Sequence, residues 1–354
     1  MANTDDKPAL KITLEDLNKV EVAKPGAVMA AGAAAAAGAR QYGNISSSIA
    51  EAPVVEEGKS NFLLQGWFYL GSAGLVGALI GWGIAEPLFV DGQGATMANR
   101  LLIPSVVAFM CMGFGVSESV VERSPRKAVL RGLMSLGLGA VGGFIFDIVA
   151  NIFFAIAVGI VVELGVHTNR NPAFWIARGL AWMVFGVAGG IIYGAVDKSG
   201  KKIRYGILGG VIGAGLGGMI FDPIAMATKI GGPSRGIGFA LFGLATGVAM
   251  GIVESALKDR WLYVAAGPLA GKQFILYKPV TVIGSSQQSD IYLFKDASIQ
   301  PQHASIELRG AQTFLHSDAQ VYVSGQPARH RALNSGDLIQ IGKYAFHFRE
   351  RHRK

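Results

Sequence analysis

Long apolar runs separated by short polar turns dominate the chain from Phe62 to Leu257. Most are long enough for a bilayer crossing, which takes about 20 residues of α-helix. The pattern predicts six membrane-spanning helices in three hairpins, at about 62–121, 131–197 and 204–258. Because 131–165 is too long for one crossing, we expect residues 148–163 to form an inserted interfacial or re-entrant helix on the outer side.

The predicted hairpins resemble one another in sequence. The polar segments 121–132 and 196–206 share one order of acid, base, serine, turn residue and further bases. The glycine rows in 137–150 and 213–225 both end in Phe-Asp. Small residues that recur on one helix face let two backbones approach closely, so we expect these rows at helix contacts.

Three acidic residues take equivalent positions in this repeat, at the outer ends of the ascending helices: Glu86, Asp147 and Asp222. One interpretation places them at the outer water interface, paired with arginines that begin the descending helices: Arg100, Arg178 and Arg235. The alternative is that the three carboxylates converge to bind a cation or relay protons.

Basic residues accumulate in the two polar turns between hairpins. They are Arg123, Arg126, Lys127, Arg131, Lys198, Lys201, Lys202 and Arg204. Because Lys and Arg are enriched in cytoplasmic loops, we predict a protein of the cytoplasmic membrane with these turns and both termini in the cytoplasm.

Composition agrees with a membrane protein, since 51% of residues are hydrophobic, 16% are charged and 49 are glycine. The single cysteine, Cys111, excludes an intrachain disulfide.

Residues 1–60 are expected to be a disordered cytoplasmic arm, with one short helix from Thr13 as an option. No nucleophile with an adjacent base and no metal-ligand spacing is visible, so we expect no enzyme, no metal, no cofactor and no nucleic-acid partner.

After Leu257 the pattern changes to short alternating runs broken by glycine, serine, asparagine and proline, which predicts an all-β sandwich over 259–354. A spaced set of glycine, acidic, histidine and apolar positions runs through this region: Gly284, Asp290, Ile291, Asp296, His303, Ala304, Gly325, Gly336, Asp337, Ile341 and Gly342. In order and approximate spacing these positions resemble the forkhead-associated (FHA) family. The resemblance implies an eleven-stranded sandwich whose loops at one end grip a phosphothreonine.

Several residues that grip phosphate in that family are replaced here. Ser285 stands where the family carries arginine, Gln300 where it carries serine, and Ala319 with Gln320 where it carries Asn-Gly. Phosphate capture needs charge-assisted hydrogen bonds from such groups, so we expect phosphothreonine recognition to be largely lost.

The candidate partner-binding positions are therefore the equivalents of the phosphopeptide loops: Ser285, Ser286, Gln300, Gln302, Ser317, Asp318, Arg329 and Arg331. The expected structural framework is Gly284, Asp290, His303, Gly336 and Asp337.

The sequence predicts a membrane-anchored scaffold over residues 61–258 that presents a divergent FHA module to a cytoplasmic protein partner, phosphorylated or not. Two alternatives stay open: a small ion or proton transporter with the tail as regulator, and a phosphothreonine-dependent signalling receptor. The sequence does not indicate the oligomeric state.

Overall fold

The structure is a computed structural model that describes residues 62–92, 96–168, 170–228 and 231–351. The predicted N-terminal arm and the helix option at Thr13 lie outside these residues. In the described part, six helices are long and apolar enough to cross a membrane, as the apolar runs predict. They are α4 (Gly66–Ala85), α6 (Leu102–Val121), α7 (Pro125–Glu163), α8 (Pro172–Val196), α9 (Gly200–Thr228) and α10 (Gly231–Leu257).

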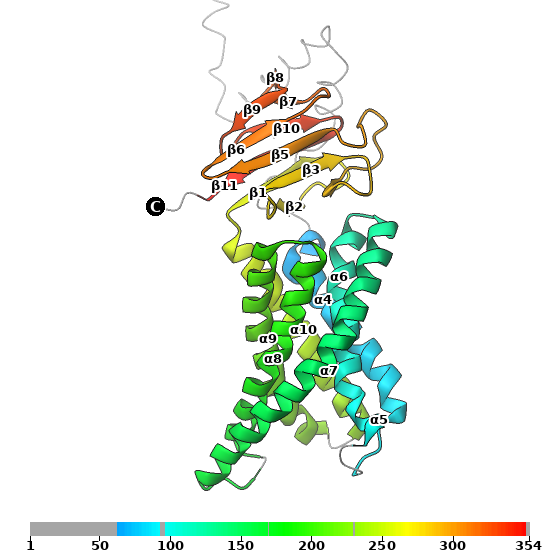
Figure 1. Cartoon of the computed structure of the whole chain (residues 1–354), viewed down its shortest axis with the longest axis vertical. Coiled ribbons are helices and arrows are strands. Elements are labelled where there is room, and N and C mark those ends of the chain that lie inside the picture. The colour runs from blue at the N-terminus through cyan, green and yellow to red at the C-terminus, as the bar shows by residue number, and fades with distance from the viewer. Residues whose placement is uncertain (1–61, 93–95, 169, 229–230, 352–354) are drawn as a thin grey trace, which may run out of the picture. The chain divides into compact units, whose positions relative to one another are not determined.

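Figure 1 shows these helices running side by side, and the contacts between them close a ring. Each long helix contacts the next one along the chain, and α10 returns to contact α4. Short elements link α4 to α6, namely η3 (Glu86–Leu88) and α5 (Met97–Arg100), and η2 (Phe62–Leu64) precedes α4. Trp182 lies inside the ring, where its side chain packs against Phe221, Phe239 and Phe242.

Glycines lie at the closest helix contacts. A Cβ added at Gly77 of α4 would lie closer than 3.0 Å to the Phe109 carbonyl oxygen of α6, and one at Gly213 of α9 would meet Ala245 of α10 in the same way. Only hydrogen fits at these positions, so a larger residue has to separate the backbones.

The region around residues 148–163 forms differently from the expectation. Helix α7 runs without a break from Pro125 to Glu163, so these residues continue the preceding helix and are no separate inserted or re-entrant element. No proline interrupts the run after Pro125, and the apolar residues continue the helical backbone. At 1.5 Å per residue its 39 residues span about 58 Å, well beyond a hydrocarbon core of about 30 Å.

The two basic turns share one backbone geometry. Arg123 between α6 and α7 and Lys198 between α8 and α9 both have a left-handed φ of 53°. The following serine in each turn, Ser124 or Ser199, donates its backbone N–H to the carbonyl five residues earlier. Both helix ends therefore close in the same hydrogen-bonded form, in which a left-handed residue satisfies carbonyls of the last turn.

Residues 260–350 form a sandwich of two sheets that contains eleven strands in the described part of the chain, the number that the FHA resemblance implies (Figure 1). One sheet has the order β2-β1-β11-β10-β7-β8, and the other β4-β3-β5-β6-β9. The strands are β1 (Arg260–Ala266), β2 (Gln273–Ile275), β3 (Val280–Gly284), β4 (Ile291–Tyr292), β5 (Ala304–Arg309), β6 (Gln312–His316), β7 (Tyr322–Val323), β8 (Gln326–Pro327), β9 (His330–Leu333), β10 (Leu338–Ile341) and β11 (Tyr344–Glu350).

Alternate residues of both sheets point inward and form one apolar core, which includes Leu262, Ile283, Ile306, Leu315 and Phe346. All five are fully buried. The apolar positions of the two-residue period that predicts strands are therefore also the residues that form the core.

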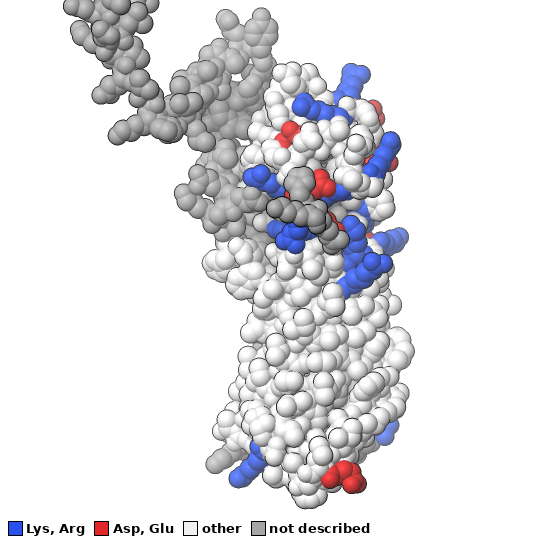
Figure 2. All heavy atoms as spheres, turned by 90° about the vertical axis from the view of Figure 1, so that its left-hand side faces the viewer, with Lys and Arg blue, Asp and Glu red and all other residues white. Residues whose placement is uncertain are grey.

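Charged side chains are distributed unevenly over the surface. Figure 2 shows Lys and Arg gathered over the sandwich and the adjoining helix ends, and a broad belt without charge over the helices on the face in view. Apolar side chains such as Val141, Ile152 and Leu208 are exposed on the helices. An uncharged apolar belt of this kind suits contact with lipid.

Candidate functional site

A hollow in the sandwich surface brings together four of the eight predicted partner-binding residues. Gln302, Ser317, Asp318 and Arg329 line it, and its volume is about 550 Å³. Gln302 comes from the turn before β5, Ser317 and Asp318 follow β6, and Arg329 precedes β9. The lining carries both an acid and a base, so the hollow favours a ligand with mixed polar groups over a multiply charged anion.

The other four predicted residues do not line this hollow. Ser285 donates from its backbone N–H to the Gln300 carbonyl and from its hydroxyl to the Ile299 carbonyl. Ser286 donates its backbone N–H to the Pro301 carbonyl. Arg331 reaches across the sandwich and donates to the Val323 carbonyl of the opposite sheet. These groups hold loops and sheets to one another.

His303 lines the hollow and binds the loops on either side of it. Its side chain is buried, its Nδ1 accepts from the Gln300 backbone N–H at 3.2 Å, and its Nε2 lies 3.0 Å from the Gln320 carbonyl. Ser317 adds a second link, because its hydroxyl donates to the His303 carbonyl at 2.6 Å. These bonds fix the turns before β5 and after β6 to each other.

The remaining framework positions stabilise turns. A Cβ at Gly284 would overlap the Pro301 carbonyl, so only glycine allows the loops around β3 and β5 to approach. Asp290 accepts from the Val282 backbone N–H, and Asp337 accepts from the Asn334 N–H. Gly336 has φ of +105°, a conformation that favours glycine.

Asp296 fastens the loop after β4 to the β10–β11 turn. One carboxylate oxygen accepts from the Ser298 hydroxyl at 2.7 Å, and the other from the Lys343 backbone N–H at 2.7 Å. Partial burial by itself raises the pKa of Asp296, but these hydrogen bonds outweigh it and hold the pKa below its usual range.

We expect Asp296→Asn to lower the free energy of unfolding at pH 7 by about 1 kcal/mol, because the ionised acceptor is lost. A carboxylate with a depressed pKa in the folded state stabilises above its unfolded pKa of about 4 and loses that contribution as the pH falls through its folded pKa. The difference between wild type and Asp296→Asn should therefore shrink between pH 7 and pH 3. Thermal unfolding of both proteins across that range checks this, and a difference that grows in acid would contradict it.

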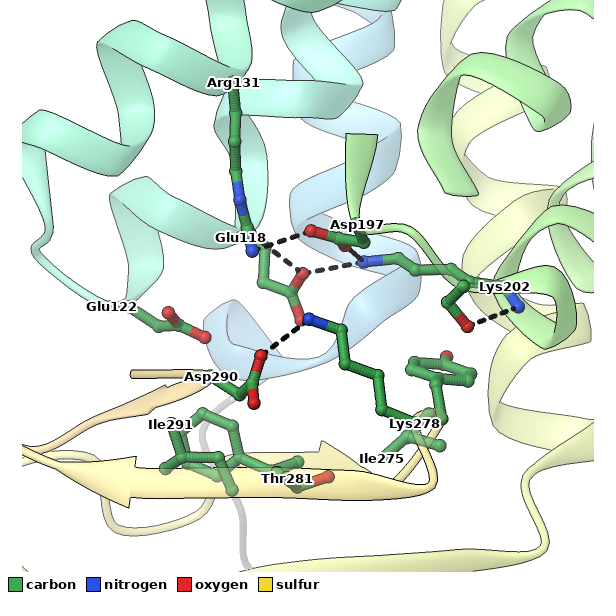
Figure 3. Close-up of a pocket in the computed structure, with 13 residues that line it drawn as sticks. Glu118, Glu122, Arg131, Asp197, Lys202, Ile275, Lys278, Thr281, Asp290 and Ile291 are labelled. Atoms are coloured by element: carbon green, nitrogen blue, oxygen red, sulfur yellow. Dashed lines mark hydrogen bonds and ion pairs between the residues drawn. The ribbon is translucent and has the colours of Figure 1, made fainter. Parts of the chain in front are cut away.

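A second polar site lies where the helices meet the sandwich, around a cavity of about 60 Å³ (Figure 3). Lys272, just before β2, forms an ion pair of 2.9 Å with Glu122 at the end of α6. Their side chains are only 1% and 3% exposed. Lys127 of α7 donates to the backbone carbonyl of Ser289, in the loop between β3 and β4. The two parts of the chain are thus joined by desolvated charges.

Further charges from the helix ends surround this cavity. Lys202 of α9 pairs with Glu118 of α6 at 2.7 Å and with Asp197 after α8. Arg131 of α7 pairs with Asp197 at 2.7 Å. Figure 3 shows these side chains converging from different helices above β3. The sequence predicted Arg131 and Lys202 in cytoplasmic turns but did not indicate their acidic partners.

Tyr277 approaches the cluster from the sandwich side. Its hydroxyl donates to Glu254 of α10, and its ring meets Tyr205 of α9 edge-on at 6.2 Å. Burial, followed by the charge of Glu254, raises the pKa of Tyr277 well above its usual value, so the phenol stays a donor.

The three predicted outer acids, Glu86, Asp147 and Asp222, contact different side chains. Arg178 of α8 pairs with Asp222 of α9 at 2.8 Å, and Arg235 of α10 pairs with Glu86 at 2.5 Å. Asp147 accepts from the Asn151 side chain through its backbone carbonyl. Asp222 and Glu86 thus each pair with an arginine from a different predicted hairpin.

The sequence of the sandwich matches known proteins. Residues 263–352 match the family model Yop-YscD_cpl, described as the cytoplasmic domain of an inner membrane component of T3SS. The chain is 36% identical over 90 residues to the glycogen accumulation regulator GarA of Mycolicibacterium smegmatis, which is 25% of this chain and 56% of that protein. It is 35% identical over 92 residues to an oxoglutarate dehydrogenase inhibitor of Corynebacterium diphtheriae, 25% of this chain and 64% of that protein. The C-terminal domain is an FHA-like domain.

Solved structures of FHA domains are similar to this domain as well. The FHA domain of the CT664 protein from Chlamydia trachomatis is 25% identical with a TM-score of 0.25, covering 27% of this chain and 100% of that one. The FHA domain of an Arabidopsis thaliana protein is 21% identical with a TM-score of 0.25, covering 27% and 89%. The chain spans less than two thirds of the length of the curated relatives above.

Proposed function

We propose that the protein is a membrane-anchored adaptor whose FHA-like domain binds a cytoplasmic protein partner without requiring phosphothreonine. FHA domains are protein-interaction modules, and here one follows six helices that are long and apolar enough to span a membrane. The observation that carries the proposal is the hollow lined by Gln302, Asp318 and Arg329, on the same domain as the replaced phosphate-gripping residues.

Two serine hydroxyls in the predicted binding loops already donate hydrogen bonds within the domain, which supports binding that does not require phosphate. Those of Ser285 and Ser317 donate to backbone carbonyls within the domain, so they are engaged in holding the loops. Asp318 adds a negative charge to the hollow, which opposes a dianionic phosphate. A partner that presents both hydrogen-bond donors and a carboxylate matches Asp318 and Arg329 better.

Anchoring explains the outer acids better than transport does. Asp222 and Glu86 each hold an arginine of another helix at ion-pair distance, and among the described residues no three acids or histidines gather as a cation site. The two acid–arginine pairs between predicted hairpins and the matched turns at Arg123 and Lys198 support repeated hairpins.

The proposed orientation rests on the basic turns, and single cysteines test it. Cys111 is buried, so background labelling is low. In intact cells a membrane-impermeant maleimide should label Met97→Cys, an exposed position between α4 and α6, and should label Ala297→Cys of the FHA-like domain only after permeabilisation. Labelling of Ala297→Cys in intact cells would contradict the orientation.

A photocrosslinking amino acid at Gln302 tests the binding surface in native membranes. We expect a defined protein adduct that persists after phosphatase treatment and that is lost when Arg329 is replaced by alanine. The matched control places the same probe at Ala311, an exposed position in the turn between β5 and β6 that does not line the hollow.

An adduct that forms equally from Ala311, or that survives Arg329→Ala, would count against the hollow as the binding surface. Loss of the adduct after phosphatase treatment would favour a phosphothreonine reader instead.

A further inference from the structure

Two histidines lie side by side on the outer face of the sheet that contains β5, β6 and β9. His316 of β6 is the direct cross-strand partner of His330 of β9. Their Nδ1 atoms are 2.9 Å apart, their ring centroids are 4.3 Å apart, and the ring planes are inclined by 46°. The two Nδ1 atoms therefore lie within hydrogen-bond distance of each other, close enough to share one ligand.

Neighbouring side chains hold both rings in this orientation. The Glu307 carboxylate lies 3.1 Å from Nε2 of His316, and Arg309 holds Glu307 through two hydrogen bonds of 2.8 Å. The ring of Phe314 stacks on His330 with a centroid distance of 5.6 Å and nearly parallel planes. The pair is thus fixed on each side by a different contact.

This arrangement has the features of a metal-ligand pair. The 3.1 Å contact between Glu307 and Nε2 of His316 is not a hydrogen bond, but the negative charge of the carboxylate favours the tautomer with the proton on Nε2, which leaves the Nδ1 lone pair available. Metal-ligating histidines commonly carry such a carboxylate on the other ring nitrogen. Both histidines also line the hollow of about 550 Å³, so water has room to complete the coordination.

We propose that His316 and His330 chelate one divalent transition-metal ion of the Ni²⁺, Cu²⁺ or Zn²⁺ class through their Nδ1 atoms, with Glu307 as positioning residue. Imidazole suits these ions and not Mg²⁺ or Ca²⁺. The described residues offer no third histidine, cysteine or acid at ligand distance, so the remaining ligands are waters and the affinity is modest. The site does not depend on the membrane orientation or on the partner proposed above.

The spacing of the two histidines in the sequence gives no sign that they form a pair. His316 and His330 are separated by thirteen residues that contain β7 and β8, so they match no ligand spacing and led to the expectation of no metal. Only the pairing of β6 with β9 places them opposite each other.

The test is calorimetric titration of untagged, chelator-treated full-length protein in detergent with Ni²⁺, repeated with Zn²⁺ and Mg²⁺. We expect one saturable equivalent of Ni²⁺ and of Zn²⁺ per chain and none of Mg²⁺. His330→Gln should weaken binding by about 10-fold or more, and Glu307→Gln by about 10-fold, since outer partners of metal ligands contribute on that order.

His167→Gln is the matched control, because this histidine is exposed on a connection between α7 and α8 and should not change the isotherm. Thermal unfolding of each variant confirms that the fold is kept. Absence of a one-equivalent isotherm, or equal binding by His330→Gln, would mean that the Nδ1 contact is a hydrogen bond only and would overturn the proposal.

Discussion

Replacing Lys272 with methionine is expected to lower the free energy of unfolding of the full-length protein by about 3–5 kcal/mol. The substitution leaves the carboxylate of Glu122 buried without its ammonium partner, at a position that is 3% exposed. An unpaired buried charge costs more than the net value of the pair, because its desolvation is no longer offset. Lys127 remains 3.7 Å from Glu122 and compensates only in part.

Chemical denaturation in detergent micelles measures this effect, with Lys201→Met as the control. Lys201 pairs with Asp259 at 3.5 Å across the same junction, but its side chain is 46% exposed, so its loss should cost less than about 1 kcal/mol. The double variant Lys272→Met with Glu122→Met removes both charges and should recover most of the loss. Equal stability of Lys272→Met and wild type would refute the buried pair.

Gly77→Ala is expected to destabilise the helical part by about 1–3 kcal/mol, because the added methyl group has to push the α4 backbone away from α6. The contact is with the Phe109 carbonyl, which cannot rotate away as a flexible side chain can. Thermal unfolding in detergent, followed by helical circular dichroism, measures the change.

Gly83→Ala is the matched control in the same helix, since a Cβ there has nothing within 4 Å. Removing glycine from a helix interior is favourable by about 0.5–1 kcal/mol, so this variant should be unchanged or slightly stabilised. If both alanine variants behave alike, helix propensity and not close packing governs α4.

The helices and the sandwich were predictable because both depend on local patterns. Apolar runs of sufficient length specify the six long helices whatever their neighbours are, and the period of two specifies most strands. Strand β1 departs from this period, since five consecutive residues from Leu262 to Ala266 are buried. Helix α7 was divided on the basis of bilayer thickness, which limits a crossing but does not end a helix.

The polar sites were less predictable because their partners come from distant parts of the chain. Lys272 and Glu122 are 150 positions apart, so nothing near either residue indicates the pair. The outer arginines were expected beside acids, but sequence alone could not show that Arg178 meets Asp222 of the next predicted hairpin. The loop residues were easier to locate, because strand ends fix where Gln302 and Asp318 lie.

The most direct test of the central claim is the affinity of the full-length protein, in lipid nanodiscs, for library peptides synthesised in paired threonine and phosphothreonine forms. Each charge-assisted hydrogen bond to phosphate contributes about 1.5–3 kcal/mol, so a true phosphate reader would bind the modified form more than about tenfold more tightly. We predict affinities within about threefold of each other for every pair that binds, and weaker binding of both forms by Arg329→Ala. A preference for phosphothreonine above about tenfold would contradict the account.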